Sequence, residues 1–68
     1  MNNRIIEVVV KPSGNANIDG ILVDQNEIRD HLKNLKKLGF SRFETKPYCG
    51  LVSHIRVENM RKLITSLR

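Results

Sequence analysis

Residues 24–40 read DQNEIRDHLKNLKKLGF, and this stretch decides much of the fold. Its apolar side chains recur at the spacing of one helix face. They are Ile28, Leu32, Leu35 and Leu38. The pattern predicts an amphipathic helix from about Gln25 to Leu38, with one apolar stripe turned towards a core.

Signals for a helix N-terminus surround the start of this stretch. Asp24 is a good N-cap, because its carboxylate can accept amide hydrogen bonds of the first turn. Glu27 lies three residues later and can reach back, which would complete a capping box. Val23 and Ile28 are spaced as a hydrophobic staple. We therefore expect the helix to begin directly after Asp24.

The other end of the helix is marked as clearly. Gly39 follows the last residue of the apolar stripe and can adopt the left-handed conformation that ends helices. Phe40 would then pack back on Leu35, as in a Schellman motif. Lys36 and Lys37 lie in the last turn, where the helix dipole favours cations. The helix is thus predicted to end at Leu38.

Strand patterns precede the helix. The β-branched run from Arg4 to Lys11 predicts a strand, and it carries apolar residues on both faces. Such a strand is either central in a sheet or covered on its second face by a partner. Residues 12–17 have the composition of a loop. Residues 18–23 form a candidate short strand, which Asp19-Gly20 either interrupts or folds into a tight turn.

Two alternating segments follow the helix, Ser41–Lys46 and Leu51–Val57. They predict a hairpin closed by the loop Tyr48-Cys49-Gly50, with glycine at the left-handed position. Its register would set apolar residues opposite each other on the inner face. The opposed pairs would be Phe43 with Ile55 and Thr45 with Ser53 inside, and Arg42 with Arg56 and Glu44 with His54 outside.

A last helix is predicted after Asn59, which would cap it. Its apolar stripe is Met60, Leu63, Ile64 and Leu67. Together these elements predict one α+β domain over residues 1–68. The predicted sheet is small and antiparallel, with three or four strands, and two helices pack on one face. The predicted order is β(β)αββα.

From Asp24 onward, the order helix, strand, strand, helix resembles the double-stranded-RNA-binding-domain fold. It is similar also to the small HicA-type toxin ribonucleases that share this fold. The residues that carry the resemblance are Leu38-Gly39-Phe40, Gly50 and His54. The extra N-terminal strand, the missing third strand and the spacing of Gly50 and His54 depart from that pattern. The resemblance therefore concerns topology and assigns no role to His54.

Composition indicates the cellular compartment and the oligomeric state to expect. The chain has 68 residues and one cysteine, Cys49, so no internal disulfide can form, and a lone thiol suits a reducing compartment. The chain shows neither the pattern of a signal peptide nor an apolar run that could span a bilayer, so we expect a cytoplasmic protein without a membrane partner. A domain this small is marginally stable alone, which favours a homodimer.

Positive charge is concentrated in the second half of the chain. The net charge is +5, and of the 12 basic residues only Arg4 and Lys11 precede Arg29. Such an excess favours nucleic acid or an acidic protein surface as the partner. The candidate binding residues are Arg29, Lys33, Lys36 and Lys37 on one flank of the first helix, Arg42, Lys46 and Arg56 on the outer hairpin face, and Arg61 and Lys62 on the last helix.

Two smaller features complete the candidate sites. Tyr48 at the hairpin tip is a candidate interaction anchor, because tyrosine offers a large contact area at low entropic cost. His54 beside Glu44 has the composition of a general-base pair, but no nucleophile shares its face. Neither histidines, cysteine nor carboxylates show metal-ligand spacing, and no cofactor motif is present.

These observations favour a small non-enzymatic nucleic-acid-binding regulator. The alternative is a protein-interaction module or inhibitor, for example one encoded by a phage or mobile element, that binds an acidic surface of a larger host complex. A ribonuclease with His54 as its base ranks third.

Overall fold

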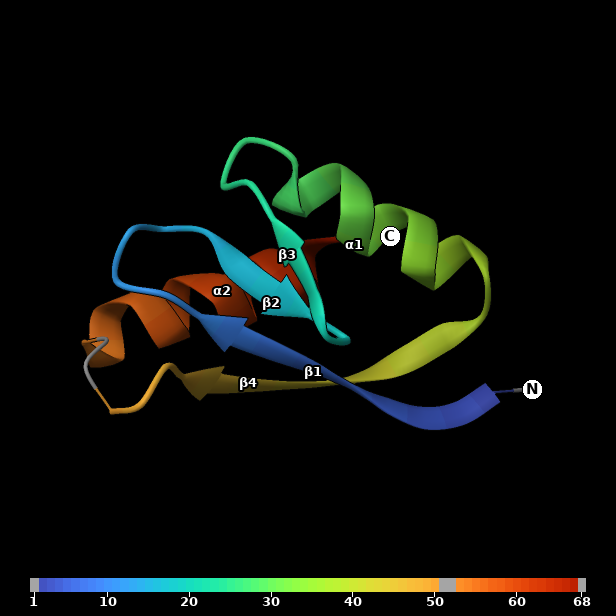
Figure 1. Cartoon of the computed structure of the whole chain (residues 1–68). Helices are drawn as coiled ribbons and strands as arrows, with labels where there is room; N and C mark the ends of the chain where they lie inside the picture. Colours follow the sequence, from blue (N-terminus) through green and yellow to red (C-terminus); the bar gives the residue numbers. More distant parts are fainter. Residues whose placement is uncertain (1, 51–52, 68) are drawn as a thin grey trace.

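A computed structural model describes residues 2–50 and 53–67 of the chain. Within these residues the chain forms four strands and two helices (Figure 1). In chain order they are β1 (Asn2–Val10), β2 (Ala16–Ile18), β3 (Ile21–Val23), α1 (Ile28–Lys37), β4 (Phe40–Pro47) and α2 (His54–Ser66). The α+β class is thus confirmed, while the observed order βββαβα differs from the predicted one.

The strands form one mixed sheet in the order β3-β2-β1-β4. Strand β1 runs antiparallel to β2 and parallel to β4, with Ile6 opposite Phe43 and Val8 opposite Thr45. The prediction of a purely antiparallel sheet is therefore wrong. Parallel strands need a long crossover, and here the chain from β2 through α1 returns to lay β4 beside β1.

Strand β1 is central, as its two apolar faces suggested. Its side chains Ile6, Val8 and Val10 are buried, whereas Ile5 on the other face is half-exposed. Of the two alternatives for Asp19-Gly20, the tight turn is the one that forms, and it joins β2 to β3. Asp19 and Gly20 both have positive φ, at 54° and 83°, which is the signature of a two-residue type I′ hairpin turn.

Helix α1 is shorter at its start than predicted. Asp24 Oδ1 does accept the amide hydrogen bond of Asn26 at 2.9 Å, but residues 25–27 form a turn and the N-cap of α1 is Glu27. The Glu27 side chain makes no capping hydrogen bond, so the predicted capping box is not formed. Asp24 stabilises the turn that leads into the helix.

The C-terminal signals of α1 are confirmed in part. Gly39 has φ of +105°, and its amide donates to Lys36 O at 3.0 Å, which is one bond of the Schellman motif. Phe40 and Leu35 both pack against the core. Leu38, however, is 73% exposed, because it follows the last helical turn as the C-cap instead of completing the apolar stripe.

The predicted C-terminal hairpin is wrong. Helix α2 begins at His54, with Ser53 as its N-cap, where a strand was expected. Ile55 is 71% exposed while Val57 is buried, although both would share one face of a strand. Asn59 lies inside α2 and caps nothing. Leu51 and Val52, the first residues of the expected strand, lie outside the described residues.

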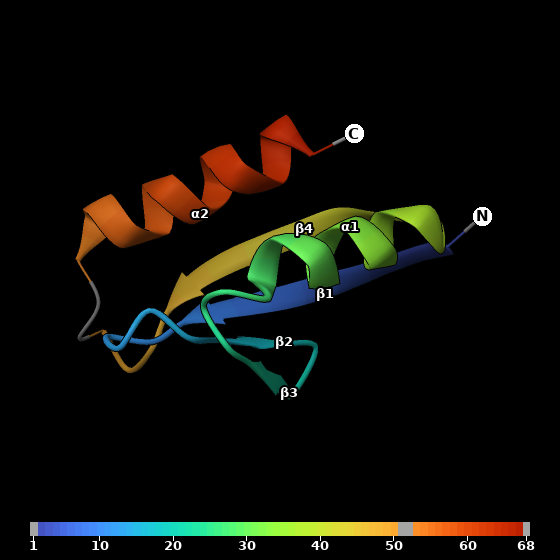
Figure 2. The same ribbon diagram turned by 90° about the horizontal axis from the view of Figure 1, so that it is seen from above.

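In the described part of the chain a single strand, β4, separates the two helices, so the resemblance to the double-stranded-RNA-binding-domain order fails. The hydrophobic core draws on every element, including Ile18 of β2, Leu32 of α1 and Met60 of α2. Helix α2 packs against β4 and β1 (Figure 2). That both helices pack on one face of the sheet stays a prediction. Neither helix in the described part of the chain is long and apolar enough to cross a membrane.

Candidate nucleic-acid interface

The basic flank of α1 faces α2. Arg29, Lys33, Lys36 and Lys37 follow one another at intervals of four, three and one residues, which places them on one side of the helix. The contacts of Lys36 show that this side of α1 faces α2. Its Nζ atom donates to Ile64 O at 2.6 Å and to Leu67 O at 2.8 Å, both at the C-terminal end of α2.

Lys36 is thereby part of the folded framework. The last carbonyl groups of a helix lack partners within the helix, and an ammonium group there is favoured by hydrogen bonding and by the helix dipole. The same Nζ atom lies 5.9 Å from the ring centre of Phe43 in β4. Lys36 thus ties together α1, α2 and β4, and its charge is already engaged.

Two hollows lie between the helices, and together we call them the interhelical groove. The first, of about 330 Å³, is lined by Lys33, Lys36, Lys37 and Leu67. The second, of about 250 Å³, lies between the start of α1 and the first half of α2, and Arg56, Asn59 and Gln25 supply its polar lining. Basic side chains therefore border the groove at both ends.

Among the described residues, no acidic side chain lines either hollow. Ion pairs within residues 2–50 and 53–67 join Arg4 to Asp19, Lys46 to Glu7 and Glu44, and Arg61 to Glu58. None of these pairs neutralises a basic residue of the groove. The groove therefore presents a local excess of positive charge to solvent.

Residues of α2 divide between two surfaces. Arg56 and Asn59 line the groove, whereas Lys62 is exposed about 120° around the helix from Arg56, outside the lining of either hollow. Arg61 belongs elsewhere, since it lines a hollow beside β4 and its Nη1 atom lies 3.1 Å from Glu58 Oε1. Of the three basic candidates on this helix, Arg56 is the one that lines the groove.

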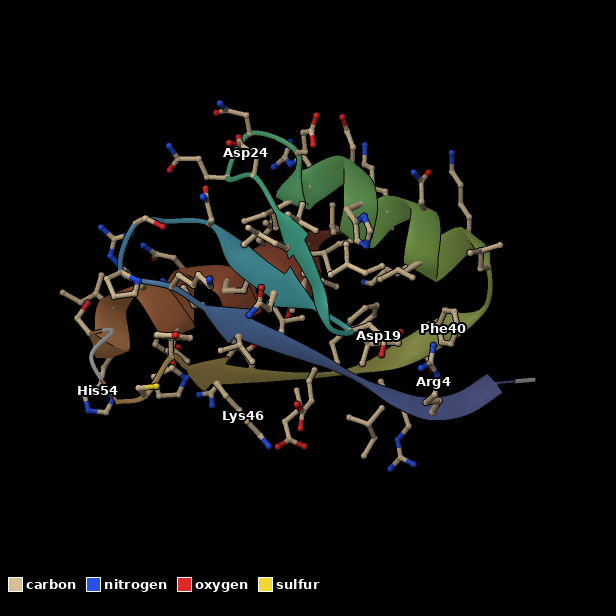
Figure 3. All side chains as sticks on the ribbon, in the orientation of Figure 1. Arg4, Asp19, Asp24, Phe40, Lys46 and His54 are labelled. Atoms are coloured by element: carbon tan, nitrogen blue, oxygen red, sulfur yellow. The ribbon has the colours of Figure 1, made fainter. Side chains whose placement is uncertain are left out.

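The basic hairpin face predicted from the sequence does not exist. Arg42 and Lys46 lie on β4, whereas His54 and Arg56 lie on α2, so the proposed pairs of Arg42 with Arg56 and Glu44 with His54 are wrong. Glu44 instead stands opposite Glu7 of β1. In Figure 3, Lys46 projects from the side of the sheet away from α1, and His54 lies at the end where α2 begins.

Lys46 lies close to two carboxylates and offsets the repulsion between their negative charges. Its Nζ atom lies 3.0 Å from Glu7 Oε2 and 3.3 Å from Glu44 Oε1. Hydrogen bonds to Glu7 first and to Glu44 second raise the pKa of Lys46 above its ordinary value, and the charges of both carboxylates add to the shift. Lys46 is thus compensated locally, which makes it a poor candidate for binding an external anion.

Tyr48, the candidate interaction anchor, already contacts neighbouring residues through its backbone and its ring. Its amide donates to Val10 O at 3.0 Å, and Lys11 Nζ lies 5.2 Å from its ring centre. Its side chain is 37% exposed, so one edge of the ring remains available. The turn at residues 48–50 leads towards α2 and is not a hairpin tip.

Sequence reasoning missed the polar groove residues Gln25 and Asn59. The signal for Asn59 was its spacing of three from Arg56, which becomes visible only once α2 is known to begin at His54.

Among the described residues, no group of three or more histidine, cysteine or acidic side chains is placed to hold a metal ion. Comparisons with protein-family models, curated proteins and solved structures give no match to this chain.

Proposed function

We propose that this protein is a nucleic-acid-binding regulator whose interhelical groove contacts the phosphate backbone. The observation that carries the proposal is the pair of hollows between α1 and α2, which are bordered by Lys33, Lys37 and Arg56 and which no acidic side chain of the described residues lines. Backbone binding of this kind is driven largely by the release of counterions from neutralised phosphates.

Within the groove the residues differ in role. The phosphate contacts on α1 are Lys33 and Lys37, which line the groove, because no ion pair among the described residues engages their charged ends. Arg29 lies outside the lining, on the same side of α1, and would add a contact beyond the groove. Arg56 is the contact on α2. Lys36 holds α2 in position through its two hydrogen bonds. Its charge adds to the positive potential of the groove, but it makes no phosphate contact of its own. Because these contacts read charge and not base edges, the binding is expected to depend weakly on sequence.

A salt titration tests the proposal. Fluorescence anisotropy with a labelled DNA duplex and a labelled RNA duplex would give the affinity at several salt concentrations. Each phosphate contact contributes about 0.9 to the slope of log affinity against log salt for duplex DNA. The double variant Lys33→Gln/Lys37→Gln is therefore expected to lower the magnitude of the slope by about 2, with weaker binding at every salt concentration.

A matched variant separates groove binding from net charge. Lys11→Gln/Lys46→Gln also removes two positive charges, but at sites outside the groove. It is expected to bind duplex with nearly the wild-type slope. Absence of any wild-type affinity at low salt, or an equal loss in both double variants, would reject the groove as a nucleic-acid site.

The second candidate function is binding to an acidic surface of a larger protein complex, as an inhibitor encoded by a phage or mobile element would do. It is favoured by large apolar side chains that are more than half exposed on β3, namely Ile21 and Leu22, and by Ile5 on β1. Affinity purification with and without nuclease distinguishes the two. A partner retained after nuclease treatment and lost in Lys33→Gln/Lys37→Gln would favour the protein target.

A further inference from the structure

Strand β4 leaves one of its edges open. It is eight residues long, lies at the end of the sheet and, among the described residues, pairs with β1 alone. The strand at the other end of the sheet, β3, has only three residues. A long open edge presents unpaired amides and carbonyls that can take up another strand.

The ladder with β1 shows which amides face outward. Tyr48 donates its amide hydrogen to Val10 O of β1. Because alternate residues of a strand turn their backbone groups to the same neighbour, Lys46 and Glu44 also face β1. The amides of Ser41, Phe43 and Thr45 then face the open edge. Pro47 belongs to this outward set, where its missing amide hydrogen removes no bond from the existing ladder.

The charged side chains of β4 can pair with those of a second copy of the same strand. Arg42 and Glu44 are exposed and project from the same face of β4, two residues apart. In an antiparallel pair of two β4 strands centred on Phe43, Arg42 of each copy stands opposite Glu44 of the other. Cross-strand pairs of opposite charge are stabilising.

Other registers are less favourable. Centring the pair on Arg42 or on Glu44 sets like charges directly opposite each other. Centring it on Thr45 sets Pro47 opposite Phe43, and the two copies then lose the hydrogen bonds that the proline nitrogens cannot donate. A shift by a single residue would join the core face of one copy to the solvent face of the other. The Phe43 register alone satisfies both the charges and the donors.

Space for the second copy lies between β4 and α2. An open hollow of about 350 Å³ there is lined by Phe43, Thr45, Ile64 and Arg61, among others. Phe43 itself is only partly buried. On the two-fold axis of the Phe43 register, the Phe43 rings of the two copies would meet beside this hollow. Figure 2 shows α2 running alongside β4.

We propose that the protein forms a symmetric dimer through antiparallel pairing of two β4 strands about Phe43. The partner is a second copy of this chain, and the two sheets become one continuous sheet. The proposal is independent of the interhelical groove, because none of the residues lining the groove lies on β4.

Charge reversal with mutual rescue tests the dimer. Analytical ultracentrifugation of the wild-type chain, from about 1 μM to about 1 mM, should show a mass that rises from 7.8 kDa towards twice that value. Arg42→Glu and Glu44→Arg should each dimerise roughly tenfold more weakly, because each turns two attractive pairs into repulsive ones. Both positions are exposed, and although Glu44→Arg also removes the ion pair with Lys46, the pair of Lys46 with Glu7 remains; far-UV circular dichroism checks that the fold is retained.

Mixing the two variants tests whether opposite charges across the interface restore dimerisation. An Arg42→Glu chain paired with a Glu44→Arg chain again sets opposite charges across the axis, so the equimolar mixture should form heterodimers at near wild-type affinity. A wild-type chain that remains at 7.8 kDa throughout would overturn the proposal and leave the edge to a strand from another protein. Dimerisation that is unchanged in both single variants, or not rescued by mixing, would overturn the Phe43 register.

Discussion

Replacing Lys36 by methionine isolates the one lysine of the α1 flank that the fold itself uses. Methionine keeps most of the apolar stem but removes the ammonium group that donates to Ile64 O and Leu67 O. A hydrogen bond to a charged group is worth about 1.5–3 kcal/mol when its partner is buried, and less where water can replace it. Because this lysine is only partly buried, we take about 2 kcal/mol for the loss of both bonds.

The loss should be visible in two measurements. For a domain of this size about 2 kcal/mol corresponds to a fall in Tm of roughly 8–16 °C. Urea unfolding followed by far-UV circular dichroism should show a lower midpoint with an unchanged m-value. Amide hydrogen exchange should accelerate most in the last turn of α2, whose carbonyls lose their partner.

Lys37→Met is the matched control. Lys37 is exposed on the same flank and engages no carbonyl among the described residues, so its replacement should change the free energy of unfolding by less than about 0.5 kcal/mol. Equal stability of Lys36→Met and Lys37→Met would refute the reasoning, because it would show that the contact between Lys36 and the end of α2 does not stabilise the fold.

Three further perturbations probe other parts of the account. Leu32→Ala should cost about 2–5 kcal/mol in urea unfolding, because Leu32 is completely buried, whereas Leu38→Ala should cost less than about 0.5 kcal/mol; similar losses would contradict the observed end of α1. Gly39→Ala should lower the thermal midpoint by the equivalent of about 1 kcal/mol or more, since φ of +105° is strained for alanine, and an unchanged midpoint would argue against this conformation. The pKa of Lys46 is raised in the folded state, so its stabilising effect is complete below the pKa of the unfolded chain and disappears as the pH rises through the folded value. The stability difference between wild type and Lys46→Gln should therefore vanish at strongly alkaline pH, and a difference that grows there would contradict the ion pairs.

The parts of the fold that could be predicted are those fixed by local chemistry. The β-branched run of β1 and the glycine after α1 each depend on a few neighbouring residues, and both predictions hold; the Asp19-Gly20 turn was one of two alternatives and is the one that forms. The parallel pairing of β1 with β4 could not be read in this way. It joins residues about forty positions apart, and a strand pattern carries no mark of its neighbour's direction.

The error over α2 has a specific cause. Residues 51–57 alternate between apolar and polar, and over so short a stretch this period cannot be told from the start of a helix stripe through Val57, Met60 and Leu67. Ser53, which is the N-cap of α2, was interpreted only as a strand residue, although serine is a residue type favoured at N-caps. The consequence for the candidate site was large, because the hairpin face depended entirely on that strand. The α1 flank rested on a secure helix, and the structure places it beside α2.

The most direct test of the central claim is a map of amide chemical shifts during titration with a short DNA or RNA duplex. The account predicts that the largest shifts cluster at Lys33, Lys37, Arg56 and Asn59, on the two sides of the interhelical groove, and that they fade as salt is raised. Shifts centred on Ile5, Glu7 and Lys46 of the opposite sheet face, or no shifts at low salt, would contradict it.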